Sequence, residues 1–313
     1  MMADAPNAIV VVALGGNALL ARDETPDTAT QRGHARAAVA ALAPLARTHR
    51  LVVTHGNGPQ VGLLALAHGD DGTPLDVLDA ETEGMLGYLL AQELDNALPR
   101  AQRAVALLTQ VEVAADDAAF AHPDKPIGPV YASHRAAALG ARHGWTLVAD
   151  GAGVRRTVAS PRPLGIVELD VIELLVAHGV VVICAGGGGI PVARRADGLL
   201  AGVPAVVDKD LASSLLARSL GAAALLLLTD VAALYDGHGT TAARAWREIG
   251  SATLARYRFA PGTMAPKVAA CREFVDAGGG FAAIGSLDAA AAVLAGRAGT
   301  RIVKGDAPGR YWT

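Results

Sequence analysis

The sequence predicts an α/β protein whose central sheet is mostly parallel and is covered by helices on both faces. Three apolar stretches, residues 8–14, 180–192 and 222–229, lack the alternation of polar and apolar side chains, which is typical of strands buried on both faces. Segments with apolar residues at helical spacing separate these strands. Strands and helices that alternate along a chain favour a parallel sheet between two layers of helices.

The individual elements follow in chain order. We expect a strand at residues 8–14, a helix at 31–48 in which Pro44 marks a break or a kink, a strand at 51–54 and a helix at 82–98. The same criteria predict further strands at 104–113, 222–229, 281–284 and 302–303, and further helices at 166–178, 211–220 and from 267 to about 277. The stretch 180–192 is the centre of the pattern, because it leads a buried strand directly into four consecutive glycines.

Residues 114–163 interrupt this alternation. They contain five prolines and several histidines, and they show little periodicity. This composition predicts an excursion from the main sheet. The excursion is either a lid or small subdomain, or an ordinary long surface insertion.

Composition narrows the possible partners. The net charge of -3, the pI near 6.3 and the lack of a basic cluster with interleaved aromatics argue against a nucleic-acid partner and favour a small molecule. Cys184 and Cys271 lie far apart and form no CxxC pair, which is typical of a reducing compartment. The first seven residues do not resemble a signal peptide, and residues 220–228 are too short to cross a bilayer. We therefore expect a cytoplasmic protein without a membrane partner.

Glycines follow three of the predicted strands, in Gly15-Gly16-Asn17, in Gly56-Asn57-Gly58 and at 186–189. At the carboxyl end of a parallel strand, glycines let backbone N–H groups approach an anion closely, so these turns predict a substrate cradle. A hinge or tight turn at 186–189, and asparagines that only tolerate a left-handed backbone, are the alternatives. None of the turns matches the dinucleotide fingerprint, and the chain has no GxxxxGK[ST] loop. A Rossmann dehydrogenase and a P-loop enzyme are therefore disfavoured.

Two lysines lie where the same chemistry could use them. Lys209 stands between Asp208 and Asp210 after a buried-type run, and Lys267 lies at a loop-to-helix junction. Phosphoryl transfer needs cations and N–H donors around the phosphoryl oxygens, usually with Mg2+. An exposed ion-pair cluster is the alternative for Lys209, and the two aspartates could orient it or reach a metal through water.

Other enzyme classes lack support. The chain contains neither HExxH nor GxSxG, which argues against zinc hydrolysis and serine acyl transfer. No residue is assigned to a metal held by the protein itself.

Nine segments in this order resemble the carbamate kinases, which belong to the amino acid kinase superfamily. They are ALGGNA (13–18), HGNGPQVG (55–62), LTQVEV (108–113), KPIGP (125–129), VASPRP (158–163), CAGGGGIPV (184–192), VDKDLAS (207–213), LLTDV (227–231) and APGTMAPK (260–267). Together they span almost the whole chain. The family often has an aromatic-containing segment where this chain reads GAGVR at 151–155, and an aspartate where Ala232 stands.

The resemblance implies a three-layer αβα sandwich of two lobes, with a small lid subdomain that projects from the first lobe. We expect the carbamate-binding lobe at residues 1–205, the lid at about 115–165 and the nucleotide-binding lobe at 206–313. The implied reaction is reversible phosphoryl transfer between carbamoyl phosphate and ADP, giving ATP and carbamate, with Mg2+ bound to ATP or ADP. A homodimer is also implied.

The resemblance also assigns roles to individual residues. Lys209 and Lys267 would neutralise charge on the phosphoryl group in transit, and Asp210 would position Lys209. Lys125 would close over the carbamoyl end when the lid moves. The substrate would also contact the glycine turns, at Gly15, Gly16, Asn17, Gly56, Asn57, Gly58, Gly187 and Gly188. The nucleotide would contact Asp208, Thr229, Asp230, Tyr235, Gly262 and Met264.

Two other functions stay open at this point. The chain could be a superfamily kinase for another small acid, or a non-catalytic protein that senses carbamoyl phosphate or nucleotide. The sequence does not tell whether the carbamoyl phosphate would come from the breakdown of arginine or of purines and allantoin.

Overall fold

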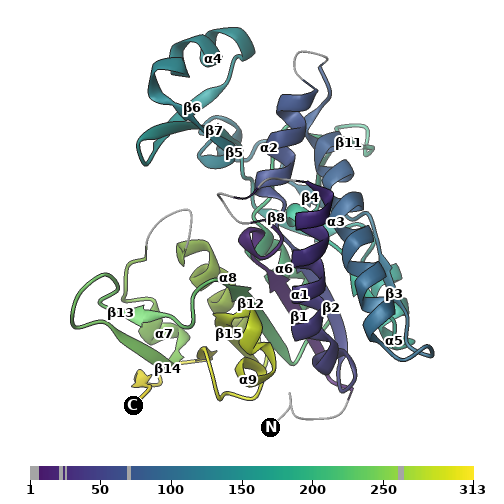
Figure 1. The fold of residues 1–313 in the computed structure, drawn as a ribbon, viewed down its shortest axis with the longest axis vertical. Coiled ribbons are helices and arrows are strands. Elements are labelled where there is room, and N and C mark those ends of the chain that lie inside the picture. The colour runs from purple at the N-terminus through teal and green to yellow at the C-terminus, as the bar shows by residue number, and fades with distance from the viewer. Residues whose placement is uncertain (1–6, 21–23, 25–26, 69–71, 260–263) are drawn as a thin grey trace.

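The computed structural model describes residues 7–20, 24, 27–68, 72–259 and 264–313. Within these residues, ten strands form one central sheet (Figure 1). Its order is β13 (Tyr235–Asp236), β14 (Arg244–Gly250), β16 (Thr300–Val303), β15 (Phe281–Ser286), β12 (Ala224–Thr229), β1 (Ile9–Leu14), β2 (Arg50–His55), β9 (Val181–Ile183) and β3 (Ala104–Ala106), with β17 (Arg310–Tyr311) paired to β14. The pairs from β15 through β12, β1, β2 and β9 to β3 are all parallel. The predicted mostly parallel sheet is confirmed.

Helices cover both faces of this sheet, and β1 shows why. Val10 and Val12 point into one apolar cluster, whereas Val11 and Ala13 point into the other, and all four are fully buried. The first cluster lies under α1 (Thr28–Ala46), α3 (Leu75–Ala97) and α9 (Ala290–Leu294). The second lies under α5 (Leu169–Ala177), α6 (Lys209–Ser219), α7 (Ser251–Leu254) and α8 (Met264–Asp276). The chain therefore has the three-layer αβα architecture.

Two smaller sheets complete the fold. One has the order β11 (Leu200–Gly202), β10 (Ile190–Arg194), β4 (Gln110–Val113) and β8 (Pro163–Ile166). The other has the order β5 (Lys125–Ala132), β7 (Gly153–Val158) and β6 (Thr146–Asp150), and with α4 (Ala136–His143) it forms a small unit that projects from the rest of the molecule (Figure 1). The expected excursion from the main sheet is thus an ordered subdomain.

The subdomain meets the main body at α2 (Gly58–Ala67), a helix that the sequence analysis did not predict. A Cβ atom on Gly62 would lie 1.9 Å from the Cα atom of Gly128, so α2 and β5 touch through bare backbone. The sequence pattern favours a glycine turn at the first residues of α2, because glycines at 56, 58 and 62 obscure the helical spacing of the apolar residues between them. Gly56 and Gly62 make close backbone contacts, whereas Gly58 has no atom near its Cβ position and begins the helix.

Several predicted boundaries are wrong, for two physical reasons. Residues 104–113 and 180–192 each form two strands, because each run leaves the central sheet and enters the second sheet after a short break. Ile166 belongs to β8 and not to the following helix, α3 begins seven residues before Thr82, and α1 begins three residues before Gln31. Apolar periodicity alone does not locate such ends.

The predicted division into lobes at residue 205 stays a prediction. The central sheet is continuous across it, since β1 pairs with β12 on one side and with β2 on the other. Among the helices that the structure describes, none is long and apolar enough to cross a membrane.

Candidate active site

A cavity of about 870 Å³ opens where β1, β2 and β12 end at their carboxyl termini. This edge of a parallel sheet is the usual place for a ligand. Most of the predicted site residues line the cavity: Gly15, Gly16, Gly56, Asn57, Gly58, Lys125, Gly187, Asp208, Lys209, Asp210, Thr229, Asp230, Tyr235, Met264 and Lys267. Segments from both halves of the chain therefore meet at one site.

Three predicted residues have a different outcome. Gly188 does not line the cavity, because it packs behind it, where an added Cβ atom would lie 2.3 Å from the carbonyl oxygen of Val207. Asn17 belongs to the short 3-10 turn Gly16–Ala18, and its side chain lies outside what the structure describes. Gly262 lies outside the described residues.

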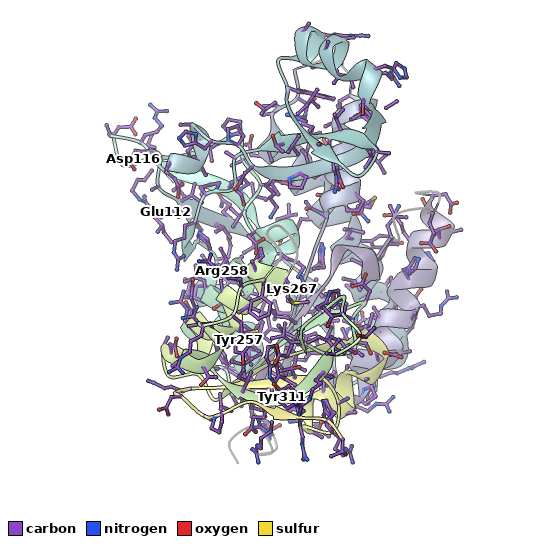
Figure 2. The ribbon with its side chains drawn as sticks, turned by 90° about the vertical axis from the view of Figure 1, so that its left-hand side faces the viewer. Glu112, Asp116, Tyr257, Arg258, Lys267 and Tyr311 are labelled. Carbon is purple, nitrogen blue, oxygen red and sulfur yellow. The ribbon has the colours of Figure 1, made fainter. Side chains whose placement is uncertain are left out.

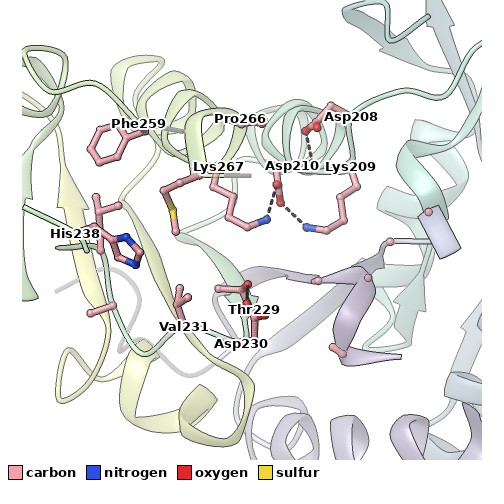
Figure 3. Close-up of a pocket in the computed structure, with 18 of the residues that line it drawn as sticks. Asp208, Lys209, Asp210, Thr229, Asp230, Val231, His238, Phe259, Pro266 and Lys267 are labelled. Carbon is pink, nitrogen blue, oxygen red and sulfur yellow. Dashed lines mark hydrogen bonds and ion pairs between the residues drawn. The ribbon is translucent and has the colours of Figure 1, made fainter. Parts of the chain in front are cut away.

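Asp210 joins the two lysines at the start of α6. Its Oδ1 atom accepts a hydrogen bond from Nζ of Lys209, and its Oδ2 atom accepts one from Nζ of Lys267 at 2.9 Å. Figure 3 shows both amino groups converging on Asp210, on the side of Thr229 and Asp230. The chain has four lysines, and three of them, Lys125, Lys209 and Lys267, line this cavity. The alternative of an exposed ion-pair cluster at Lys209 is therefore wrong.

Burial and mutual attraction set the charges of this triad. Burial alone would raise the pKa of Asp210, but the two ammonium groups hold that pKa well below its usual range. Burial alone would lower the pKa of Lys267, but the attraction of Asp210 outweighs it and the net shift is upward. Burial, together with repulsion from Lys267, lowers the pKa of Lys209. Asp210 is thus a firmly ionised anion between two cations, and a further anion would stabilise the excess positive charge.

Asp208 links α6 to the projecting subdomain. Its Oδ1 atom caps α6 by accepting from the backbone N–H groups of Asp210 and Leu211, at 2.9 and 3.2 Å. Its Oδ2 atom accepts from Nζ of Lys125 at 3.3 Å, and the same Nζ atom donates to the carbonyl oxygen of Val207 at 3.2 Å. Lys125, at the start of β5, is therefore held over the cavity from the subdomain side.

The glycine turns bring backbone together beneath the lysines. A Cβ atom on Gly56 would lie 2.9 Å from the backbone nitrogen of Gly16 and 3.5 Å from Cδ of Lys209. The N–H groups of Gly15 and Gly56 already donate to carbonyl oxygens, those of Leu228 and Leu14. The donors that remain for a ligand therefore come from the residues after them, and at the start of α2 this is Gly58, because Pro59 has no N–H group.

Asn57 does not adopt the left-handed conformation that was one alternative for it. Its φ and ψ angles are -138° and 7°. The side-chain amide instead donates to Oδ1 of Asp79 at 2.9 Å and to Oγ1 of Thr82 at 2.8 Å. Left-handed backbone occurs at Ala185, whose φ angle is 49°, and at Gly187 in the third turn.

The sequence analysis missed the aromatic side of the cavity. Trp246, Tyr257 and Phe259 line it, with Arg258 and His238, and the rings of Trp246 and Tyr257 meet edge to face at 4.8 Å. Figure 2 shows Tyr257, Arg258 and Lys267 near the middle of the molecule, above Tyr311. Aromatic residues make up only 4% of the chain, so their grouping between 235 and 259 was the available signal.

Fold and site together define a class of protein. The protein is an αβα sandwich, and two lysines and a helix N-terminus lie at the carboxyl edge of its sheet. Such a site can bind a phosphoryl group in transit. The adjoining space lined by aromatic residues can bind a flat base. Residues 8–286 match the model of the amino acid kinase family.

Individual relatives narrow this class. The chain is 48% identical to the carbamate kinase of Rhizobium meliloti (strain 1021) over 94% of this chain and 92% of the relative, and 48% identical to that of Escherichia coli (strain K12) over 94% and 98%. The solved structure of carbamate kinase from Giardia lamblia bound to AMP-PNP superposes with a TM-score of 0.86 at 39% identity, covering 96% of this chain and 99% of that one. The chain therefore belongs to the amino acid kinase family, within its carbamate kinase branch.

Proposed function

We propose that this protein is a phosphotransferase that moves a phosphoryl group reversibly between carbamoyl phosphate and ADP, giving ATP and carbamate. The observation that carries the proposal is the convergence of three of the four lysines on one cavity, beside the open start of α2. The relatives that are named carbamate kinases cover nearly the whole chain, and the Giardia enzyme is described as bound to AMP-PNP.

The lysines would act on the group in transit. A terminal oxygen of ADP forms a new bond to phosphorus, and the bond between phosphorus and the carbamate oxygen breaks, so that carbamate leaves with the bonding electron pair. Negative charge on the phosphoryl oxygens must be stabilised throughout, which is mostly electrostatic work. Lys209 and Lys267 would supply two positive charges there, and Asp210 would hold them at a fixed separation.

The two ends of the reaction would lie on opposite sides of these lysines. Lys125 and the turns at Gly16 and Gly58 would hold the carbamoyl phosphate end. Thr229, Tyr235 and Met264 line the other part of the cavity, together with the aromatic residues, and would bind the nucleotide. Carbamate is small, so discrimination would rest on hydrogen bonds to its carboxylate and amine.

Mg2+ would enter with the nucleotide. The described residues contain no group of three or more His, Cys, Asp or Glu side chains arranged to hold a metal ion, whereas single carboxylates of Asp208, Asp230 and Asp236 line the cavity. Mg2+ typically keeps several waters and is bound by substrate phosphates and one or two carboxylates. This donor set suits an ion that neutralises the phosphates of ATP or ADP.

A coupled assay for ATP formation tests this proposal. We expect turnover with carbamoyl phosphate and ADP in the presence of Mg2+, and much slower turnover when ATP is offered with acetylglutamate or glutamate. Faster phosphorylation of one of those acids would favour a superfamily kinase for another substrate. Calorimetric binding of ADP without any turnover would instead support a nucleotide sensor.

We also propose that the protein is a homodimer in a reducing compartment, namely the cytoplasm. Large apolar side chains that are more than a third exposed are concentrated in residues 77–199, among them Tyr88, Leu108, Leu164 and Leu174. Apolar side chains that are exposed in the single chain would be covered in a dimer. Light scattering should give a mass near twice 31.7 kDa, and a monomeric mass at micromolar concentration would contradict the dimer.

The proposed reducing compartment is supported by the cysteines, since both are buried free thiols.

A further inference from the structure

Helix α3 carries polar side chains on its buried face. Asp79, Thr82 and Glu83 are at most 3% exposed and lie within one turn, on the same face as Leu78 and Leu86. None of the three lines the cavity. Burying such groups costs free energy unless they form hydrogen bonds, so their partners indicate their role.

The first partner is Asn57. Both hydrogens of its amide group are donated to α3, one to Oδ1 of Asp79 at 2.9 Å and one to Oγ1 of Thr82 at 2.8 Å. The hydroxyl of Thr82 in turn donates to the backbone carbonyl oxygen of Asp79 at 2.9 Å, so its oxygen is available as an acceptor. The orientation of the amide is therefore fixed by three consistent hydrogen bonds.

This orientation determines what the start of α2 can bind. Asn57 is the N-cap residue of α2, a position at which asparagine commonly accepts from the N–H group two or three residues later. Within the described residues, its side chain makes no such capping bond. Pro59, the second residue of α2, has no N–H group, so the helix offers the N–H group of Gly58 at the cavity wall formed by Asn57, Gly58 and Pro59, where the helix dipole favours an anion. Because α3 holds the amide of Asn57, this wall is kept in one arrangement.

The second partner is the third glycine turn. The Glu83 carboxyl group accepts from the N–H groups of Gly186 at 2.7 Å and Thr109 at 3.1 Å. The turn also contains Ala185, whose positive φ angle of 49° is unfavourable for a residue other than glycine. A Cβ atom on Gly187 would lie 2.3 Å from Nδ2 of Asn57, so this turn packs directly on the same amide. Glu83 thus fixes the third turn against the second.

The role of Asp79 as a hydrogen-bond acceptor can be separated from its charge. Burial raises the pKa of Asp79 well above its usual range, and burial raises the pKa of Glu83 to about 8. In either protonation state one oxygen of Asp79 accepts from Asn57. An asparagine at this position would keep that acceptor, whereas a leucine of similar size would not.

We propose that Asp79 and Glu83 are positioning residues for the phosphoryl transfer, which rests on the function proposed above. Asp79 holds the amide of Asn57, and with it the start of α2, so that the N–H group of Gly58 keeps its place for the phosphoryl group. Glu83 holds the turn at Gly186 and Gly187 that closes over the same amide. Neither side chain touches the substrate.

The test compares Asp79→Leu, Asp79→Asn and Glu83→Gln in the assay with carbamoyl phosphate, ADP and Mg2+. We expect Asp79→Leu and Glu83→Gln to lower kcat by about 10- to 100-fold, because small displacements of positioned groups have effects of this size. KM for ADP should change less than about twofold, since Lys209 and Lys267 lie between Asn57 and the proposed nucleotide side of the cavity. Asp79→Asn should restore at least about a third of the wild-type kcat.

The control variant is Glu93→Gln. Glu93 is a buried acid on the same helix that pairs with Arg36 at 3.4 Å, away from the cavity. It should lower the thermal midpoint without lowering kcat. The positioning role is overturned if Asp79→Leu or Glu83→Gln keeps the wild-type kcat. It is also overturned if kcat falls only in proportion to the loss of folded protein, which circular dichroism measures.

A further variant guards against misfolding of Asp79→Leu. Thr82→Val removes one acceptor for Asn57 with little change of volume, so the amide is held less firmly while Asp79 stays in place. We expect kcat to fall about 3- to 10-fold while the thermal midpoint falls less than in Asp79→Leu, and a lower midpoint with normal kcat would contradict the proposal. An inactive wild-type protein would instead refute the proposed function itself, before any variant is compared.

Discussion

Replacing Lys209 with alanine is expected to lower kcat for ATP formation by at least about 1000-fold while the chain stays folded. The substitution removes a buried cation from the centre of the cavity, and the loss of one cationic or N–H contact to a transferring group typically costs a factor of this order. Asp210 keeps Lys267 as a partner at 2.9 Å, so no buried charge is left alone. Because burial already lowers the pKa of Lys209, we expect the free energy of unfolding to change by only about 1 kcal/mol.

The measurement is the steady-state kcat together with the urea midpoint of the same preparation. Lys304→Ala is the matched control, because Lys304 is the one lysine of the chain that does not line the cavity and it is exposed. That variant should match the wild type in both measurements. Turnover by Lys209→Ala within tenfold of the wild type would remove Lys209 from the proposed mechanism.

Asp210→Asn is expected to affect both stability and the pH dependence of activity. Two neighbouring buried ammonium groups would lose the anion between them, and breaking a buried pair in this way typically costs about 3–5 kcal/mol. The pKa of Asp210 is depressed in the folded state, so its stabilising contribution is fully present above the usual pKa of 3.8 and is lost as the pH falls further. At pH 7 the whole difference between variant and wild type should therefore be visible in urea titrations.

The same substitution should shift the alkaline limb of the pH–rate profile to lower pH. Without the carboxylate, repulsion between Lys209 and Lys267 favours loss of one proton, and a shift of one pH unit corresponds to about 1.4 kcal/mol. We expect a shift of at least about one unit. Glu93→Gln should lose stability without this shift, and an unshifted profile in Asp210→Asn would show that the lysines do not depend on Asp210 for their charge.

Local patterning predicted the fold class well. The apolar strands at β1, β9 and β12 are buried on both faces, and this follows from the lack of alternation in their sequences. The lack of alternation did not predict where the run 104–113 divides into β3 and β4. This division depends on the fact that β3 joins the central sheet and β4 joins the second sheet. Pairing partners are non-local, so the sequence of one strand does not contain them.

For the site, residue chemistry and spacing identified the lysines and most of the glycines. Glu83 was missed, although an acid on the apolar face of the helix predicted at 82–98 was a usable signal, and Asp79 was missed because the helix begins earlier than predicted. The aromatic residues Trp246, Tyr257 and Phe259, which line the cavity, were missed because no strand or helix was predicted around them. Gly188 was included because the whole run 186–189 predicts a substrate cradle, and its contact with Val207 is visible only in three dimensions.

By itself the sequence determined the three-layer architecture, the strand ends at which the glycines gather and the residue types available for binding a phosphoryl group. These depend on apolar periodicity and on side-chain chemistry, which are properties of short stretches. The tertiary structure alone decided that Asp210 joins its neighbour Lys209 to Lys267, which lies 57 residues further along the chain. It also decided that α3 turns the amide of Asn57 away from α2, because hydrogen bonds between distant segments depend on how the chain packs and leave no trace in local spacing.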